Sequence, residues 1–140
     1  MKELLNKLNY KDQRRIAVVN SEQGFFEAIT NELKGVITDR EIDQRCPYTF
    51  MMVFVRSVSE VEHYAPIALH NLTADGNLWF CFPRKTSKRL QTDIDRDNGW
   101  RALNASGFRE IRTVILDDDW SAMKFRNSKF IKSASAGNDK

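Results

Sequence analysis

The chain has 140 residues and a net charge of +3, from 22 basic and 19 acidic side chains. This length suits one domain with a substantial core and is too short for two ordinary domains. Nine Phe, three Trp and three Tyr exclude a largely disordered chain, and the near balance of charge argues against a nucleic-acid-binding protein, which would carry a clustered basic face.

The chain shows no membrane span and no secretion signal. No stretch approaches the roughly 18 consecutive apolar residues of a membrane-spanning helix. The segment MKELLNKLNYKDQRR is charged and amphipathic and lacks the apolar centre of a signal peptide. Cys46 and Cys81 have no metal-binding spacing, and without a secretory signal reduced thiols are favoured over a disulfide. We therefore expect a cytoplasmic protein.

The first part of the chain alternates between helix and strand patterns. The leucines of MKELLNKL predict a short helix, and the β-branched run IAVVN (16–20) predicts a strand covered on both faces. A second amphipathic helix follows, with Ser21 as its predicted cap and Gly35 as its predicted end. VITD (36–39) then predicts a short strand.

The middle of the chain contains its longest apolar run. REIDQRCP (40–47) is typical of a polar loop, and YTFMMVFV (48–55) predicts a buried central strand. Apolar residues at helical spacing predict a helix over 58–72, which Pro66 should break or kink unless a fresh turn begins there. TADG (73–76) has the composition of a turn.

The last part of the chain predicts a strand, a helix and a hairpin. NLWFCFP (77–83) is a third apolar strand, and a basic loop follows it. Asp97 is the predicted cap of a helix that Gly107 ends. EIRTVILDD (110–118) and SAMKFR (121–126) predict an antiparallel hairpin with its tight turn at DDDW.

This order of elements predicts the fold class. We expect a three-layer α/β/α Rossmann-like domain over residues 1–126, with a mostly parallel sheet of about six strands and an antiparallel C-terminal hairpin. From residue 127 to residue 140 the chain becomes small and polar without periodicity. We expect this segment to be a disordered tail.

Polar loops follow three of the predicted parallel strands. Ligands of such sheets bind outside the carboxyl ends of the strands, so these loops should meet there. The predicted small-ligand or anion site comprises Asn20, Ser21, Arg56, Ser57, Arg84, Lys85, Thr86, Ser87 and Lys88. Basic residues between a strand and a helix are more often solvated, so a plain loop with ion pairs to Asp93, Asp95 and Asp97 is the more common explanation of residues 84–88. Nucleic-acid binding through the basic loop 84–89 is a weaker one.

Other groups of reactive side chains have structural explanations. The three aspartates of DDDW (117–120) suggest a hard-cation site, but a tight turn explains them better, and we expect no metal. His63 and His70 are too far apart on a helix to share one ion, so we expect exposed helix histidines. Cys81 lies in an apolar strand, where burial would keep its thiol unreactive.

Residues 48–126 resemble the second half of a class I S-adenosylmethionine-dependent methyltransferase. The matching features are the strands YTFMMVFVRS and NLWFCFP, the helices ending in HNLTADG and ALNASGF, and the terminal hairpin. The chain is also similar to small uncharacterised bacterial proteins that end in a segment like WSAMKFR. The resemblance implies a Rossmann-like fold, with Asp39 or Glu41 in place of the acid that bonds the cofactor ribose.

The turn after the first strand departs from the methyltransferase pattern. It reads NSEQGFF, and its one glycine, Gly24, already lies inside the predicted helix. Side chains in place of the missing glycines would crowd a cofactor, and no catalytic motif carries over. We therefore expect a non-catalytic small-ligand, anion-binding or interaction module without a cofactor. The alternative is an S-adenosylmethionine-dependent methyltransferase-like enzyme with an atypical cofactor turn. Substrate, partner and oligomeric state stay open.

Overall fold

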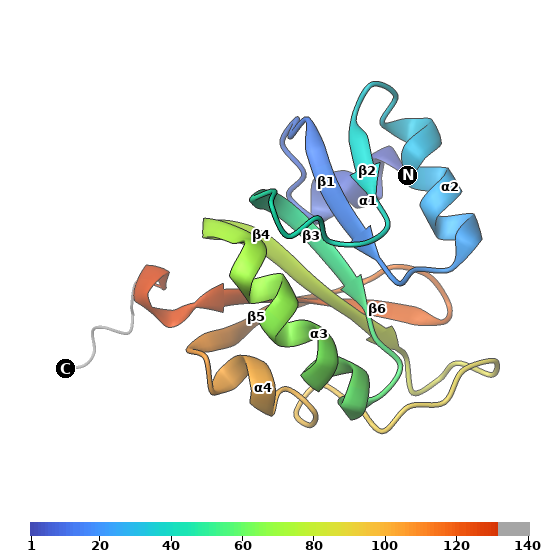
Figure 1. The fold of residues 1–140 in the computed structure, drawn as a ribbon. Coiled ribbons are helices and arrows are strands. Elements are labelled where there is room, and N and C mark those ends of the chain that lie inside the picture. Colours follow the sequence, from blue (N-terminus) through green and yellow to red (C-terminus); the bar gives the residue numbers. More distant parts are fainter. Residues whose placement is uncertain (132–140) are drawn as a thin grey trace.

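The computed structural model describes residues 1–131, in which a mixed sheet carries helices on both faces (Figure 1). This confirms the predicted three-layer α/β/α architecture. The elements are α1 (Lys2–Lys7), β1 (Arg15–Val19), α2 (Gln23–Glu32), β2 (Ile37–Asp39), β3 (Tyr48–Phe54), α3 (Val58–Asn71), β4 (Leu72–Pro83), α4 (Arg101–Asn104), β5 (Phe108–Ile115), β6 (Trp120–Asn127) and a 3-10 helix (Ser128–Phe130).

The sheet has the strand order β2-β1-β3-β4-β6-β5. Strands β2, β1, β3 and β4 run parallel, with Ala17 of β1 opposite Met51 of β3. Strand β6 is antiparallel to both β4 and β5, which confirms the predicted terminal hairpin. The chain steps outward from β1 to β2 and then crosses back to β3. The order therefore reverses between β1 and β3, where sheets of this type bind their ligands.

The central strand β3 is buried on both faces because its side chains alternate between two apolar layers. Phe50 and Phe54 pack in the cluster that contains α2 residues, and Met51 and Val53 pack in the cluster that contains α3 residues. Burying one such side chain stabilises the fold by about 1.5–3 kcal/mol. Helices α1 and α2 cover one face of the sheet, and α3 and α4 cover the other (Figure 1).

A loop without a helix, residues 40–47, connects β2 to β3, as the sequence predicts. The side-chain amide of Asn71 at the end of α3 donates to the backbone carbonyls of Asp43 (3.3 Å) and Cys46 (3.1 Å). The hydroxyl of Tyr48 accepts a bond from the backbone N–H of Asp43 at 3.0 Å. The loop therefore lies against the α3 face of the sheet in a fixed conformation.

The Tyr48 hydroxyl that contacts this loop also belongs to a polar cluster with Asp39 and Arg15. The Tyr48 hydroxyl donates to the carboxylate of Asp39 at 2.6 Å, and Nε of Arg15 donates to the same oxygen at 2.7 Å. Burial, followed by the bond to Asp39, raises the pKa of Tyr48 to about 12. The hydroxyl therefore keeps its proton and remains a donor at neutral pH.

Two predicted helix caps are wrong. Ser21 does not cap α2, because its hydroxyl bonds the carbonyl of Glu22, which is itself the N-cap residue and makes no side-chain cap bond. Asp97 does not cap α4, which begins only at Arg101. The backbone N–H of Asp97 instead donates to the Asp95 carboxylate at 2.9 Å, in a local turn that precedes the helix in the chain.

Two other boundaries differ from the prediction for backbone reasons. Helix α3 continues through Pro66, which is exposed, so the backbone bond that proline cannot make lies toward solvent. The predicted turn at residues 73–76 is part of β4. The register against β3 is irregular there, and Asp75 has a φ of 55°, so the turn-forming residues make a bulge within the strand.

The C-terminal segment begins as ordered structure. Asn127 ends β6, and the 3-10 helix Ser128–Phe130 follows, so the segment predicted as a tail from residue 127 is structured up to this point. The rest of that prediction, for residues 132–140, lies outside the described residues. None of the helices in the described part of the chain is long and apolar enough to cross a bilayer.

Candidate functional site

A cavity of about 430 Å³ lies at the carboxyl ends of β1 and β2, against α3. We call it the β1–β2 cavity. It is lined at β1 by Asn20 and Ser21, in the 40–47 loop by Glu41, and on α3 by His63 and Tyr64, among others. Its volume is within the range of small-molecule sites, and it is beside the point where the strand order reverses.

The cavity combines apolar walls with polar groups that are free to bind a ligand. Val19, Ile42 and Ile67 supply the apolar surface. Within residues 1–131 no hydrogen bond joins the side chains of Glu41, Gln44 or Tyr64 to another protein group. The His63 ring packs edge-on against Tyr64, with ring centroids 4.8 Å apart.

The phenol of Tyr64 is a neutral donor in this cavity. Burial raises its pKa, and the nearby carboxylates of Glu60 and Glu41 raise it further. A hydroxyl donor and the Glu41 carboxylate acceptor therefore line the same cavity. Such a pair suits a ligand that carries hydroxyl groups, which both donate and accept hydrogen bonds.

Asn20 shapes the turn after β1. Its backbone has a φ of 63°, a left-handed conformation that asparagine tolerates better than most residues. Its side-chain amide donates to the backbone carbonyl of Phe54 at the end of β3, at 2.9 Å. Gly24, by contrast, lies inside α2, where an added Cβ would meet nothing within 4 Å. The conformation that a glycine would supply in this turn is therefore provided by Asn20.

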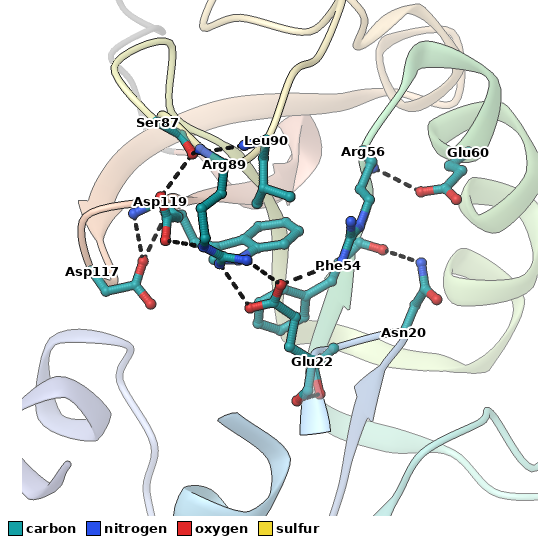
Figure 2. Close-up of polar contacts among 12 residues, drawn as sticks. Asn20, Glu22, Phe54, Arg56, Glu60, Ser87, Arg89, Leu90, Asp117 and Asp119 are labelled. Atoms are coloured by element: carbon teal, nitrogen blue, oxygen red, sulfur yellow. Dashed lines mark hydrogen bonds and ion pairs between the residues drawn. The ribbon is translucent and has the colours of Figure 1, made fainter. Parts of the chain in front are cut away.

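A polar network lies beside this turn, between the ends of β1, β3 and β6 (Figure 2). The carboxylate of Glu22 accepts two bonds from Arg89, both 3.2 Å long, and pairs with Arg56 at 3.5 Å. Arg89 also pairs with Asp119 at 2.9 Å, and the Ser87 hydroxyl donates to Asp119 at 2.7 Å. We call Glu22, Arg56, Ser87, Arg89 and Asp119 the crevice network.

The crevice network brings opposite charges together. Hydrogen bonding from Arg89 lowers the pKa of Glu22, and bonds from Ser87 and then Arg89 lower the pKa of Asp119. The three loops predicted to converge therefore do meet, but acidic side chains accompany the basic ones. Arg56 and Arg89 are already paired, which leaves less positive charge for an anion.

Several predicted site residues have structural partners instead. Ser57 is the N-cap of α3 and accepts the backbone N–H of Glu60 at 3.2 Å, and the Glu60 carboxylate accepts the N–H of Arg56 at 2.7 Å. Arg84 is directed to the β5–β6 turn, where its guanidinium donates to the backbone carbonyl of Asp117 at 3.3 Å. Ser57 and Arg84 therefore stabilise a helix end and a turn.

Lys85, Thr86 and Lys88 are exposed. They lie around two hollows that are also lined by Asp95 and Asp97 in one case and by Asp118 and Asp119 in the other. The predicted ion pairs of this loop with Asp93, Asp95 and Asp97 are wrong for the described residues, because Arg89 pairs with Glu22 and Asp119. The anion site itself stays a prediction.

Asp39 and Glu41, the two acids proposed for a ribose, are in different environments. The Asp39 carboxylate is bonded to Arg15 and Tyr48 and does not line the β1–β2 cavity. Glu41 is exposed and does line it. Sequence reasoning did not identify Tyr64 or Gln44 as site residues, because their positions depend on how the 40–47 loop crosses the sheet.

The DDDW turn, the two histidines and Cys81 have the environments that the sequence predicts. The Asp117 carboxylate accepts the backbone N–H groups of Asp119 and Trp120, both at 2.8 Å, which confirms a turn at DDDW. His63 and His70 are exposed. Cys81 is fully buried, and burial raises the pKa of its thiol. Within residues 1–131 no three His, Cys, Asp or Glu side chains gather into a metal site.

Solved structures that this fold resembles include methyltransferases. A proposed type 11 methyltransferase of Sulfolobus solfataricus matches over 90% of both chains, with a TM-score of 0.51 and 11% identity. The N-methyltransferase NodS of Bradyrhizobium japonicum WM9 matches 90% of this chain and 95% of its own, with a TM-score of 0.51 and 11% identity.

A third structure is a phosphoethanolamine N-methyltransferase of Haemonchus contortus in complex with S-adenosylhomocysteine. It matches 94% of this chain and 37% of its own, with a TM-score of 0.51 and 13% identity. No protein-family model and no curated protein sequence matches the chain. At these identities the likeness shows the fold alone. The chain has the Rossmann-like fold of the class I S-adenosylmethionine-dependent methyltransferases, as the resemblance of its second half implies.

Proposed function

We propose that this protein is a binding module that takes a small nucleoside-like ligand into the β1–β2 cavity of a methyltransferase-like scaffold. The observation that carries the proposal is the position of Glu41. Its carboxylate follows the end of β2 and lines a cavity beside the β1–β3 reversal point. In nucleotide-binding sheets an acid at this position accepts the hydroxyls of a ribose.

The other lining groups suit the base of such a ligand. Ile42 and Ile67 offer apolar surface for a flat ring, and Gln44 offers an amide with both donors and an acceptor. The loop that carries Glu41 and Gln44 is held by Asn71 and Tyr48, so the cavity wall exists before a ligand arrives. Preorganisation of this kind lowers the entropy cost of binding.

Titration calorimetry with adenosine tests the proposal. We expect a dissociation constant in the micromolar range, about −8 kcal/mol at 1 μM. Glu41→Gln should weaken binding about tenfold or more, because a hydrogen bond to a charged group contributes about 1.5–3 kcal/mol. The matched control is Glu62→Gln, an exposed position on α3 that does not line the cavity and should leave affinity unchanged. Absence of heat at high protein concentration contradicts the proposal.

Methyl transfer is the second candidate function, and the fold favours it. S-adenosylmethionine would supply an activated methyl group, and Glu41 and Tyr64 are the groups here that would hold its nucleoside part. Enzymes of this type act largely by positioning donor and acceptor, so few catalytic side chains are needed. Transfer of labelled methyl from S-adenosylmethionine to acceptors in a cell extract, dependent on Glu41, would establish it. No transfer together with adenosine binding would favour the binding module.

A further inference from the structure

Two separate hollows lie beside the turn that follows β1, at the carboxyl edge of the sheet. The β1–β2 cavity lies on its α3 side. A smaller hollow of about 290 Å³ lies on its α2 side and is lined by Glu22, Phe25, Phe54 and Trp120, among others. The bond from the Asn20 amide to the Phe54 carbonyl joins the two strand ends (Figure 2), and Asn20 lines the cavity while Phe54 lines the smaller hollow.

The crevice network borders the smaller hollow through Glu22. Glu22, two residues after Asn20, is bonded to Arg89 and paired with Arg56, so side chains from three segments meet across the strand ends (Figure 2). The Arg56 guanidinium also lies over the ring of Trp120, 5.6 Å from its centroid. The charged side chains beside the hollow on the α2 side are therefore engaged in the protein's own ion pairs.

We propose that the crevice network leaves no binding site for the aminocarboxypropyl chain of S-adenosylmethionine and S-adenosylhomocysteine, so that the part of a ligand the protein recognises is a nucleoside with a short 5′ substituent. This inference rests on the proposed function. The residues that determine this ligand specificity are Asn20 and three members of the crevice network, Glu22, Arg56 and Arg89.

The physical reason is that the extra chain of a longer ligand gains no binding energy, whether it extends toward the α2 side or toward solvent. Toward the α2 side it must separate the Asn20–Phe54 bond and displace ion pairs. The Glu22 carboxylate there repels the carboxylate of the ligand, and the two arginines that could bind this carboxylate are already paired with Glu22. Toward solvent, an extra chain that makes no protein contact adds nothing to the affinity.

The test is a calorimetric comparison of 5′-methylthioadenosine with S-adenosylhomocysteine. The two ligands share the thioadenosine part and differ in the group on sulfur, a methyl or an aminocarboxypropyl chain. We expect the wild-type protein to bind S-adenosylhomocysteine no tighter than methylthioadenosine. Binding of S-adenosylhomocysteine ten times tighter would overturn the inference and leave the proposed function intact. No heat from either ligand would overturn both.

Removing the acid of the crevice network should relax this specificity. In Glu22→Ala, Arg56 loses its acidic partner and Arg89 keeps only Asp119, so the affinity for S-adenosylhomocysteine should rise at least fivefold while that for methylthioadenosine stays unchanged. Glu22→Gln, which keeps the shape and removes the charge, should act in the same direction. The matched control is Glu27→Ala on the exposed face of α2, which should change neither affinity. Equal affinity changes for both ligands in the Glu22 variants would contradict the assignment.

Discussion

Asp39 and Glu41 are two residues apart near the end of β2, and their carboxylates lie in different environments. Asp39 is held by Arg15 at 2.7 Å and by the Tyr48 hydroxyl at 2.6 Å. Glu41 has no such partner among residues 1–131 and lines the β1–β2 cavity. One acid therefore stabilises the fold, and the next is available to a ligand.

Replacing Tyr48 by Phe should destabilise the protein. The substitution removes the donor to Asp39 and the acceptor for the backbone N–H of Asp43 in a buried position, so we expect a loss of about 1–3 kcal/mol in the free energy of unfolding. Urea denaturation measures it. Tyr64→Phe is the control, because its hydroxyl has no hydrogen bond within residues 1–131. The Tyr64→Phe variant should keep its stability and lose affinity for adenosine. An equal loss of stability in both variants would contradict the structural role given to the Tyr48 hydroxyl.

The backbone of Asn20 predicts an unusual order of stabilities. Asn20→Gly removes the bond to Phe54 but suits the φ of 63°, whereas Asn20→Ala removes the bond and keeps a side chain in a left-handed conformation. The alanine variant should therefore be less stable than the glycine variant by about 1–2 kcal/mol. Denaturation of the three proteins under one condition gives the order. A more stable alanine variant would show that this turn has another conformation in solution.

The crevice network predicts how stability depends on pH. The folded-state pKa values of Glu22 and Asp119 are lowered, so their contribution is fully present above the ordinary carboxyl values of 4.5 and 3.8. It should be lost as the pH falls through the lowered values. The wild type should therefore be more stable than Glu22→Gln at pH 7, and the difference should shrink below about pH 4. A difference that stays constant from pH 7 to pH 3 would contradict the ion pairs.

The anion site predicted from the sequence can be tested separately. Phosphate should raise the melting temperature of the wild type, and the double variant Arg84→Ala, Lys85→Ala should lose that shift. Thermal unfolding with and without phosphate at constant ionic strength measures it, since salt alone screens exposed charges. An equal shift in both proteins would remove this loop as an anion site.

Most of the fold could be predicted because its strands are long apolar runs. YTFMMVFV and NLWFCFP are each bounded by loop residues and are buried on both faces, so pattern and tertiary structure agree. Helix caps were less predictable. Ser21 and Asp97 have the right chemistry, but each makes a local bond that the sequence does not distinguish from a cap.

The candidate site could be predicted only in its location. The carboxyl edge of the sheet follows from parallel strands, but the partners of Arg89 come from α2 and from the β5–β6 turn, 67 and 30 residues away in the chain. Tyr64 faces the cavity only because the 40–47 loop crosses β1 without a helix. Contacts of this kind depend on the docking of distant segments, which no local pattern contains.

A crystal structure of the protein with 5′-methylthioadenosine tests the central claim most directly. The account predicts the ligand in the β1–β2 cavity, with its ribose hydroxyls bonded to the Glu41 carboxylate and the Glu22–Arg89 ion pair intact. A ligand bound elsewhere, or a cavity that remains empty at saturating ligand, would contradict it.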